Sequence, residues 1–320
     1  MLAREIIQRV REIQVRTGRQ VADVLAGEYV SAFKGRGIEF DEVRPYVVGD
    51  DVRTIDWNVT ARMGEPFVKR YVEERQLTLM LMADVSASQD YGSETRSKRE
   101  IAAELCALLA FSATRNDDKV GLTLFHSGIE KYIPPRKGQK HALRVVREVL
   151  AHGADAPELD SGRGFRWPRL TLGGRGRRLR RPREATDISK AVEFVMSVTP
   201  RRMVCFVVSD FMDQGYERAL QSANRKHDVV AVLITDPREF VLPSVGLVDL
   251  RDAETGRTRV VDTSSPSFRR EFERIARERV HGLERRFRSA GIDFVEIDAA
   301  GSVVDPLVRF FHMRERRQRR

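Results

Sequence analysis

The spacing of apolar residues changes twice along the first part of the chain. Residues 1–30 carry apolar side chains three or four positions apart, which predicts amphipathic helices. Residues 35–75 consist instead of short extended pieces broken by Gly, Pro and Asp, a pattern typical of irregular β structure. From Gln76 onward, apolar runs of strand length alternate with helical patterns. We therefore expect a helical and β-rich extension over residues 1–75, followed by a regular α/β domain.

The later alternation predicts a doubly wound sheet. Its first run, LTLMLMAD at 77–84, contains no polar alternation, as expected for a strand buried on both faces. Further strands are expected at 119–125, 203–210, 229–236 and 293–297, with a short extended pair near 129–134 and a hairpin over 246–262. Helices are expected near 97–115, 138–151 and 187–197, between the strands at 203–210 and 229–236, and from Pro266, which Ser265 caps. Strands that alternate with crossover helices predict a Rossmann-like, mostly parallel sheet over residues 76–302, with a basic helix or tail at 303–320.

The positive charge of the chain is concentrated in two segments. The formal net charge is +10. Residues 161–184 hold nine Arg against one Glu and residues 309–320 hold six Arg against one Glu, so the remainder carries −3. The stretch 161–184 has too little apolar surface to order itself, and we expect a mobile loop there. This basic loop leaves open binding to nucleic acid or another polyanion, although no recognised nucleic-acid fold is predicted.

Two further features favour a cytoplasmic protein. The N-terminal residues, MLAREIIQRVREIQVRTGRQ, mix arginines into the apolar positions, so we expect neither a signal peptide nor a membrane span there, and no transmembrane segment elsewhere. Cys106 and Cys205, the only cysteines, each lie within an apolar run. We expect both to be buried, reduced thiols.

Oxygen-bearing side chains follow the first predicted strand of the sheet. In the segment DVSAS, the residues Asp84, Ser86 and Ser88 lie in the turn just past the carboxyl edge. Thr186 opens a predicted helix and Asp210 ends the strand MVCFVVSD, so the predicted sheet brings both to the same edge. Carboxylate, hydroxyl and water oxygens are the ligands that Mg²⁺ and other hard divalent cations take. These five residues are therefore candidate metal ligands.

The five positions resemble the metal-ion-dependent adhesion site of von Willebrand factor A domains, which combines a D-x-S-x-S turn with a distant Thr and a later Asp. The resemblance implies one Mg²⁺, or Mn²⁺ or Ca²⁺, held by Asp84, Ser86, Ser88, Thr186 and Asp210. It also implies that the hydroxyls face the ion directly or through water, that the aspartates act mainly through water, and that one position is open to a partner's carboxylate. The segment SDFMD departs from the usual Asp-Gly turn, which leaves open whether Asp213 assists or replaces Asp210.

A longer segment resembles one bacterial family. Residues 35–75, GRGIEFDEVRPYVVGDDVRTIDWNVTARMGEPFVKRYVEER, are similar to the signature of domain-of-unknown-function family 58, which joins such a segment to an A-like domain. The matching positions are Phe40, Arg44, Tyr46, Gly49, Asp50, Arg53, Asp56, Trp57 and Arg62. The family implies partnership with a MoxR-type AAA+ ATPase in systems that assemble or activate client proteins. By this resemblance we expect a non-catalytic, metal-dependent adaptor that binds the ATPase and an unidentified client.

The segment GDDVRTIDW, residues 49–57, also has a purely structural interpretation. Its carboxylates are expected to cap a turn and to pair with Arg44, Arg53 or Arg62. The alternative is that these residues form a second acidic binding surface or a contact for the ATPase. The sequence leaves both interpretations open.

A Mg²⁺-dependent hydrolase is the enzymatic rival to the adaptor, because aspartates at strand ends also serve phosphoryl transfer. However, Ser86 stands where a phosphatase of the aspartyl-nucleophile class has its second Asp, and the chain has neither a G-x-x-x-x-G-K-[ST] loop nor a G-x-S-x-G elbow. His126 and His227, at a strand end and a helix end, are expected to have surface or capping roles. We therefore predict no catalytic residue.

Overall fold

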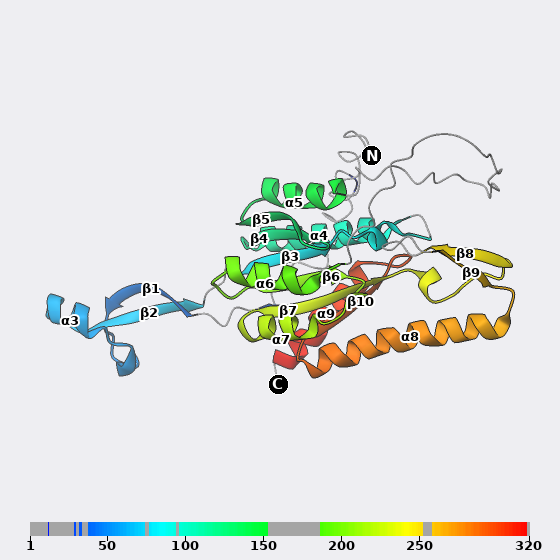
Figure 1. The fold of residues 1–320 in the computed structure, drawn as a ribbon. Coiled ribbons are helices and arrows are strands. Elements are labelled where there is room, and N and C mark those ends of the chain that lie inside the picture. Colours follow the sequence, from blue (N-terminus) through cyan, green and yellow to red (C-terminus); the bar gives the residue numbers. More distant parts are fainter. Residues whose placement is uncertain are drawn as a thin grey trace.

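The computed structural model describes residues 38–73, 77–93, 96–152, 186–251 and 258–318, together with Glu12, Tyr29, Ala32 and Phe33. Most of the predicted N-terminal helices and the whole arginine-rich stretch 161–184 lie outside the described residues. A six-stranded sheet with helices on both faces forms the centre of the described part (Figure 1). The predicted α/β fold is therefore confirmed.

The central sheet has the strand order β10-β7-β6-β3-β4-β5. In chain order its strands are β3 (Thr78–Asp84), β4 (Lys119–Phe125), β5 (Ile129–Arg136), β6 (Val204–Ser209), β7 (Asp228–Thr235) and β10 (Asp293–Asp298). All neighbouring strands are parallel except β4 and β5, so the extended pair expected near 129–134 is a single antiparallel edge strand. The chain winds outward from β3 in one direction and from β6 in the other. Ligands of doubly wound sheets bind beyond the carboxyl ends of the strands at this point of reversal.

Helices cover both faces of the sheet because side chains alternate along each strand. Leu79 and Leu81 of β3 belong to one apolar core, which the helices α4 (Lys98–Arg115), α5 (Gln139–Ala151) and α9 (Val304–Gln318) complete. Met80 and Met82 belong to the opposite core, with α6 (Ile188–Val198), α7 (Glu217–Lys226) and α8 (Pro266–Ser289). The strand β3 is thus buried on both faces, as its unbroken apolar run predicted.

The beginning of α4 is fixed by a capping box. The Ser97 hydroxyl accepts the Glu100 backbone N–H at 3.2 Å, and the Glu100 carboxylate accepts the Ser97 backbone N–H at 3.0 Å. These two bonds satisfy backbone donors that the first turn of a helix leaves unpaired. They also place Lys98 as the first residue of the helix, at the carboxyl edge of the sheet.

Residues 38–73 form an arm that projects away from the central sheet (Figure 1). Its strands β1 (Ile38–Pro45) and β2 (Phe67–Glu73) are antiparallel, and between them lie the short helices η2 (Val52–Thr54) and α3 (Trp57–Met63). The β-rich pattern expected for this region is confirmed, with the addition of these helices. Large apolar side chains are exposed on the arm, among them Val48 at 94% and Trp57 at 69%.

The carboxylates of segment 49–57 have the structural roles that the sequence suggested. Asp50 accepts two hydrogen bonds from the Arg44 guanidinium, at 2.6 and 2.8 Å. Asp51 caps η2, and Asp56 caps α3 through the backbone N–H groups of its first turn. Asp56 forms its ion pair with a lysine, Lys69, at 3.4 Å, and not with one of the three arginines that the sequence suggested.

The remaining described elements follow the sequence prediction. The strands β8 (Leu247–Arg251) and β9 (Thr258–Asp262) form the expected antiparallel hairpin, and α8 begins at Pro266 behind its cap Ser265. In α9, Arg314 pairs with Asp228 and Asp293 and stacks over the Phe33 ring at 4.6 Å. In the part of the chain that the structure describes, none of the helices has the length and apolar character needed to cross a membrane.

Candidate metal centre

The turn after β3 gathers three of the predicted ligands. Asp84 is the last residue of the strand and is buried, with 2% of its surface exposed. Its Oδ1 accepts the backbone N–H of Ser86 at 2.9 Å, which folds the turn back over the carboxylate. The hydroxyl oxygens of Ser86 and Ser88 lie 2.9 Å apart. A carboxylate and two hydroxyls therefore meet at the carboxyl edge of β3.

The neighbouring strand β6 is tied to this turn by Ser209, a residue that the sequence analysis did not single out. The Ser209 hydroxyl donates to Asp84 Oδ2 at 2.6 Å and accepts the backbone N–H of Phe211 at 3.1 Å. Both oxygens of Asp84 thus have a donor, one from each side. The only sequence signal for Ser209 was its place directly before Asp210 at the end of an apolar run.

Asp210 follows β6 and is buried beside the same turn. Its Oδ2 lies 3.3 Å from the Lys98 ammonium, and Arg279 donates to its backbone carbonyl at 3.0 Å. The next residue, Phe211, has a φ of +52°, in the left-handed region that favours glycine. A phenylalanine thus stands after Asp210 in a backbone conformation that a glycine adopts without strain.

Thr186 lies at the same edge of the sheet, directly before the cap residue of α6. The backbone N–H of Asp187 donates to the His126 carbonyl at 2.6 Å, and His126 follows Phe125, the register partner of Asp84. Thr186 is also buried, with 8% of its surface exposed. The fold thus brings the segments of all five predicted ligands to the carboxyl ends of β3, β4 and β6.

Asp213 has a different role from the one that the sequence left open. Its Oδ2 accepts the backbone N–H of Ile188, the first residue of α6, at 2.9 Å, and its Oδ1 accepts the backbone N–H of Gln214 at 2.6 Å. Asp213 therefore accepts a backbone N–H at the start of α6, whose N-cap is Asp187, and links this end of the helix to the segment after β6. This arrangement favours Asp210 as the candidate ligand.

The electrostatics of the site fit a bound cation. Burial, together with the nearby charge of Asp210, raises the pKa of Asp84 to about 7, although the donors Ser209 and Ser86 oppose the change. A cation next to Asp84 would stabilise the charged form of this buried carboxyl group. Within the described ranges, no three His, Cys, Asp or Glu residues form a metal-binding group, so a site here needs the hydroxyl oxygens as well. Carboxylate and hydroxyl oxygens are a donor set that suits Mg²⁺.

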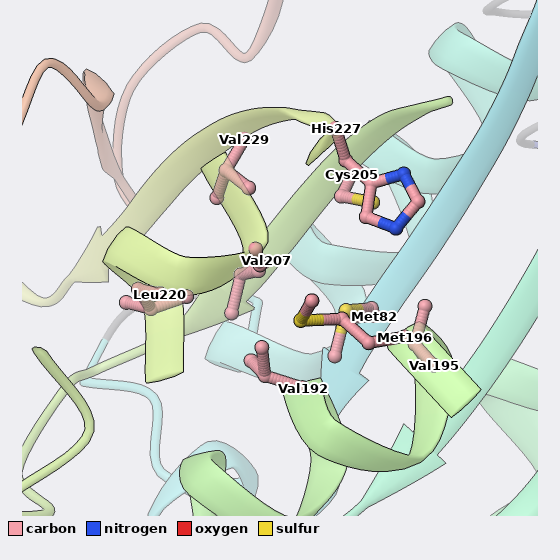
Figure 2. A pocket seen from close by; sticks show the side chains of 10 residues that line it. Met82, Val192, Val195, Met196, Cys205, Val207, Leu220, His227 and Val229 are labelled. Atoms are coloured by element: carbon pink, nitrogen blue, oxygen red, sulfur yellow. The ribbon is translucent and has the colours of Figure 1, made fainter. Parts of the chain in front are cut away.

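The side chains of His126, His227 and the two cysteines have other contacts. His126 pairs with Glu130 at 2.9 Å, and His227 ends α7 as its capping residue. Figure 2 shows His227 beside Cys205, where both line a small, mostly apolar cavity between α6, α7 and the sheet. Burial lowers the pKa of His227, which keeps its ring neutral. Cys106 and Cys205 are buried free thiols, as the sequence predicted.

Comparisons with known proteins support the sequence resemblance. The family model described as "Protein of unknown function DUF58" matches residues 42–282. An uncharacterised protein of Mycobacterium bovis is 28% identical over 308 residues, which cover 96% of this chain and 89% of the relative.

Solved structures of similar fold include the conserved hypothetical protein BatB from Bacteroides thetaiotaomicron, with 16% identity and a TM-score of 0.42 over 75% of this chain and 99% of that one. A second is the VWA domain of SpRpn10, with 12% identity and a TM-score of 0.34 over 73% of this chain and 93% of that one. Because both TM-scores are low, the assignment of the fold rests on the strand order of the sheet itself.

Proposed function

The chain belongs to the DUF58 family, and on that premise we propose that it is a non-catalytic adaptor that binds a partner protein through one divalent cation. The observation that carries the proposal is the meeting of Asp84, Ser86 and Ser88 at the end of β3, with Asp210 close enough to raise the pKa of Asp84. This cluster lies at the point of strand reversal, where doubly wound sheets bind their ligands.

Each residue of the site has a role in this proposal. The hydroxyls of Ser86, Ser88 and Thr186 would contact the ion directly or through water, as in the adhesion sites that the sequence resembles. Asp84 and Asp210 would balance its charge and orient the hydroxyls around it. A bound ion would supply a positive centre that a Glu or Asp side chain of the partner could contact.

The partner that the family resemblance supports is a MoxR-type AAA+ ATPase, which would act together with this chain on an unidentified client protein. A divalent cation that is only balanced by two carboxylates still attracts a third, external carboxylate. Charge and hydrogen-bond geometry would therefore select an acidic side chain on the partner surface. Mg²⁺ is the ion that we propose, with Mn²⁺ and Ca²⁺ as substitutes.

A pull-down tests this function directly. Tagged wild type, Asp84→Ala and Asp213→Asn are incubated with lysate of the native cells, each with Mg²⁺ and with EDTA, and bound proteins are identified by mass spectrometry. We expect an AAA+ ATPase to bind the wild type and Asp213→Asn in Mg²⁺ only, and not to bind Asp84→Ala. The variant Asp213→Asn is the matched control, because it removes a carboxylate charge at the same edge of the sheet and keeps one oxygen for the Ile188 N–H, although the Gln214 N–H loses its acceptor.

Two results would contradict the adaptor. Capture of the ATPase by Asp84→Ala with unchanged Mg²⁺ dependence would remove the site from the function. Recovery of nucleic acid in all samples, with or without metal, would favour the polyanion-binding alternative. Circular dichroism of each variant shows whether it is folded before the pull-down is interpreted.

A further inference from the structure

A buried lysine faces the candidate metal site. Lys98 is 1% exposed, and its ammonium lies 3.3 Å from Asp210 Oδ2 and 2.6 Å from Glu239 Oε1. The two carboxylates follow different strands, since Asp210 comes after β6 and Glu239 ends the short helix η4 (Pro237–Glu239) after β7. Lys98 therefore joins the candidate ligand Asp210 to the next strand end along the sheet.

The position of this lysine is costly. Burial of an ammonium removes its hydration, and the first turn of a helix carries a partial positive charge that repels it. Burial alone would lower the pKa of Lys98, but the carboxylates of Asp210 and Glu239 outweigh it and raise that pKa. The side chain is therefore a permanent positive charge, held in place by two negative ones.

The carboxylates that hold Lys98 are themselves fixed. Asp236, the cap of η4, accepts the backbone N–H of Ser93 at 2.8 Å and the Arg238 backbone N–H at 2.8 Å. Glu239 accepts the Asp236 backbone N–H through Oε2 at 3.3 Å, which leaves Oε1 for the ammonium. Because β6 lies between β7 and β3, Asp210 is held between Lys98 on one side and the turn of Asp84 on the other.

We propose that Lys98 is a built-in cation that competes with the divalent ion for Asp210 and so weakens metal binding by this chain. The inference rests on the proposed function, because it concerns the same site. A divalent ion between Asp84 and Asp210 would be charge-balanced by the two carboxylates, whereas Lys98 already neutralises one of them. Repulsion between the ammonium and the ion acts in a buried region, where charges are weakly screened.

The test is the affinity of the purified full chain for Mn²⁺, measured by electron paramagnetic resonance of the free ion. Lys98→Met keeps the approximate length of the side chain and removes its charge. We expect this variant to bind Mn²⁺ at least about tenfold more tightly than the wild type does. Glu239→Gln removes the second carboxylate that holds Lys98, so the ammonium pairs with Asp210 alone. We expect Mn²⁺ to bind about threefold more weakly to this variant. Lys226→Met is the matched control, because Lys226 caps the Thr199 carbonyl at the opposite edge of the sheet, and it should bind Mn²⁺ as the wild type does.

The outcomes separate this inference from the proposed function. If the wild type binds Mn²⁺ and Asp84→Ala does not, but Lys98→Met and Glu239→Gln bind as the wild type does, the role of Lys98 is overturned and the metal site stands. If only Lys98→Met binds Mn²⁺, the lysine excludes the ion in the wild type, which supports the competition but contradicts a metal-dependent function of the wild-type chain. Failure of every variant to bind overturns both. Should Lys98→Met not fold, Lys98→Gln takes its place, because it also removes the charge and keeps polar atoms for Asp210 and Glu239.

Discussion

At the scale of single residues, a pH-dependent effect on stability is expected from Asp118, which lies directly before β4, away from the candidate metal site. This side chain is 2% exposed and accepts the backbone N–H of Leu77 at 2.7 Å, which ties the loop before β4 to the start of β3. Burial raises the pKa of Asp118 to about 6, in spite of that hydrogen bond. The folded state thus keeps a proton that the unfolded chain releases near pH 4. Stability is therefore lost as the pH rises from about 4 through about 6.

Replacing Asp118 by Asn removes this pH-dependent loss of stability and keeps an oxygen that accepts the Leu77 N–H. A tenfold change in a protonation constant is worth about 1.4 kcal/mol, and after allowance for screening we expect the variant to gain about 1–2 kcal/mol at pH 7.5 and nothing at pH 4. Urea unfolding at both pH values measures the difference. Asp117→Asn, at the exposed neighbouring residue, is the control and should change stability little. A gain or loss for Asp118→Asn that is equal at both pH values would contradict the assignment.

The sequence indicated some residues of the candidate site and missed others. Asp84, Ser86 and Ser88 could be predicted because their short spacing places them in one turn. Ser209 could not, because its role depends on β6 lying beside β3 in the sheet, and a serine before an aspartate is common. Lys98 was missed for a similar reason, since a lysine at the start of a charged helix normally lies in solvent.

At the scale of elements, the turn from β6 to α7 contains a residue whose backbone conformation is strained and whose side chain is well packed. Phe211 has a left-handed φ of +52°, yet its ring is buried against Tyr216 and Phe287, with centroid distances of 5.7 and 5.0 Å. Burial of a phenylalanine is worth more than the backbone strain costs. The aromatic contacts thus hold the turn that presents Asp210, in the place of a glycine.

Two substitutions at Phe211 separate these contributions. Phe211→Ala should lower the free energy of unfolding by about 3–5 kcal/mol, because it leaves a cavity and keeps the strain. Phe211→Gly loses the same ring but relieves the backbone, so we expect it to be about 1 kcal/mol more stable than Phe211→Ala. Chemical denaturation of both variants provides the comparison. An alanine variant that is the more stable of the two would show that the left-handed conformation is not strained.

Most elements of the sheet were predictable, because their apolar runs depend on local sequence alone. The run 77–84 matches β3 closely, and the cap Ser265 marks the beginning of α8. The pattern of partly buried residues in β5 fits an edge strand of either orientation, so periodicity alone did not predict its direction. Antiparallel pairing follows from the short connection between Phe125 and Ile129, which is too short for a crossover to a parallel strand.

At the scale of the whole molecule, the strand order makes the site from segments far apart in the sequence. Asp84 and Asp210 are neighbours because β3 and β6 are adjacent at the point where the winding reverses.

The fold also shows what the basic C-terminal helix contacts. Arg314 and Arg317 form ion pairs with Asp293, so part of its charge is used inside the protein. These ion pairs leave less of the C-terminal charge available to an external polyanion.

The most direct test of the central claim is calorimetric titration of Mg²⁺ into the purified chain at pH 8, with Asp84→Asn and Asp213→Asn alongside. We expect one ion per chain for the wild type and for Asp213→Asn, and none for Asp84→Asn, which keeps the shape of the side chain but not its charge. Asp84→Asn that binds Mg²⁺ as the wild type does, or a wild type that binds none, would contradict a metal centre at the end of β3.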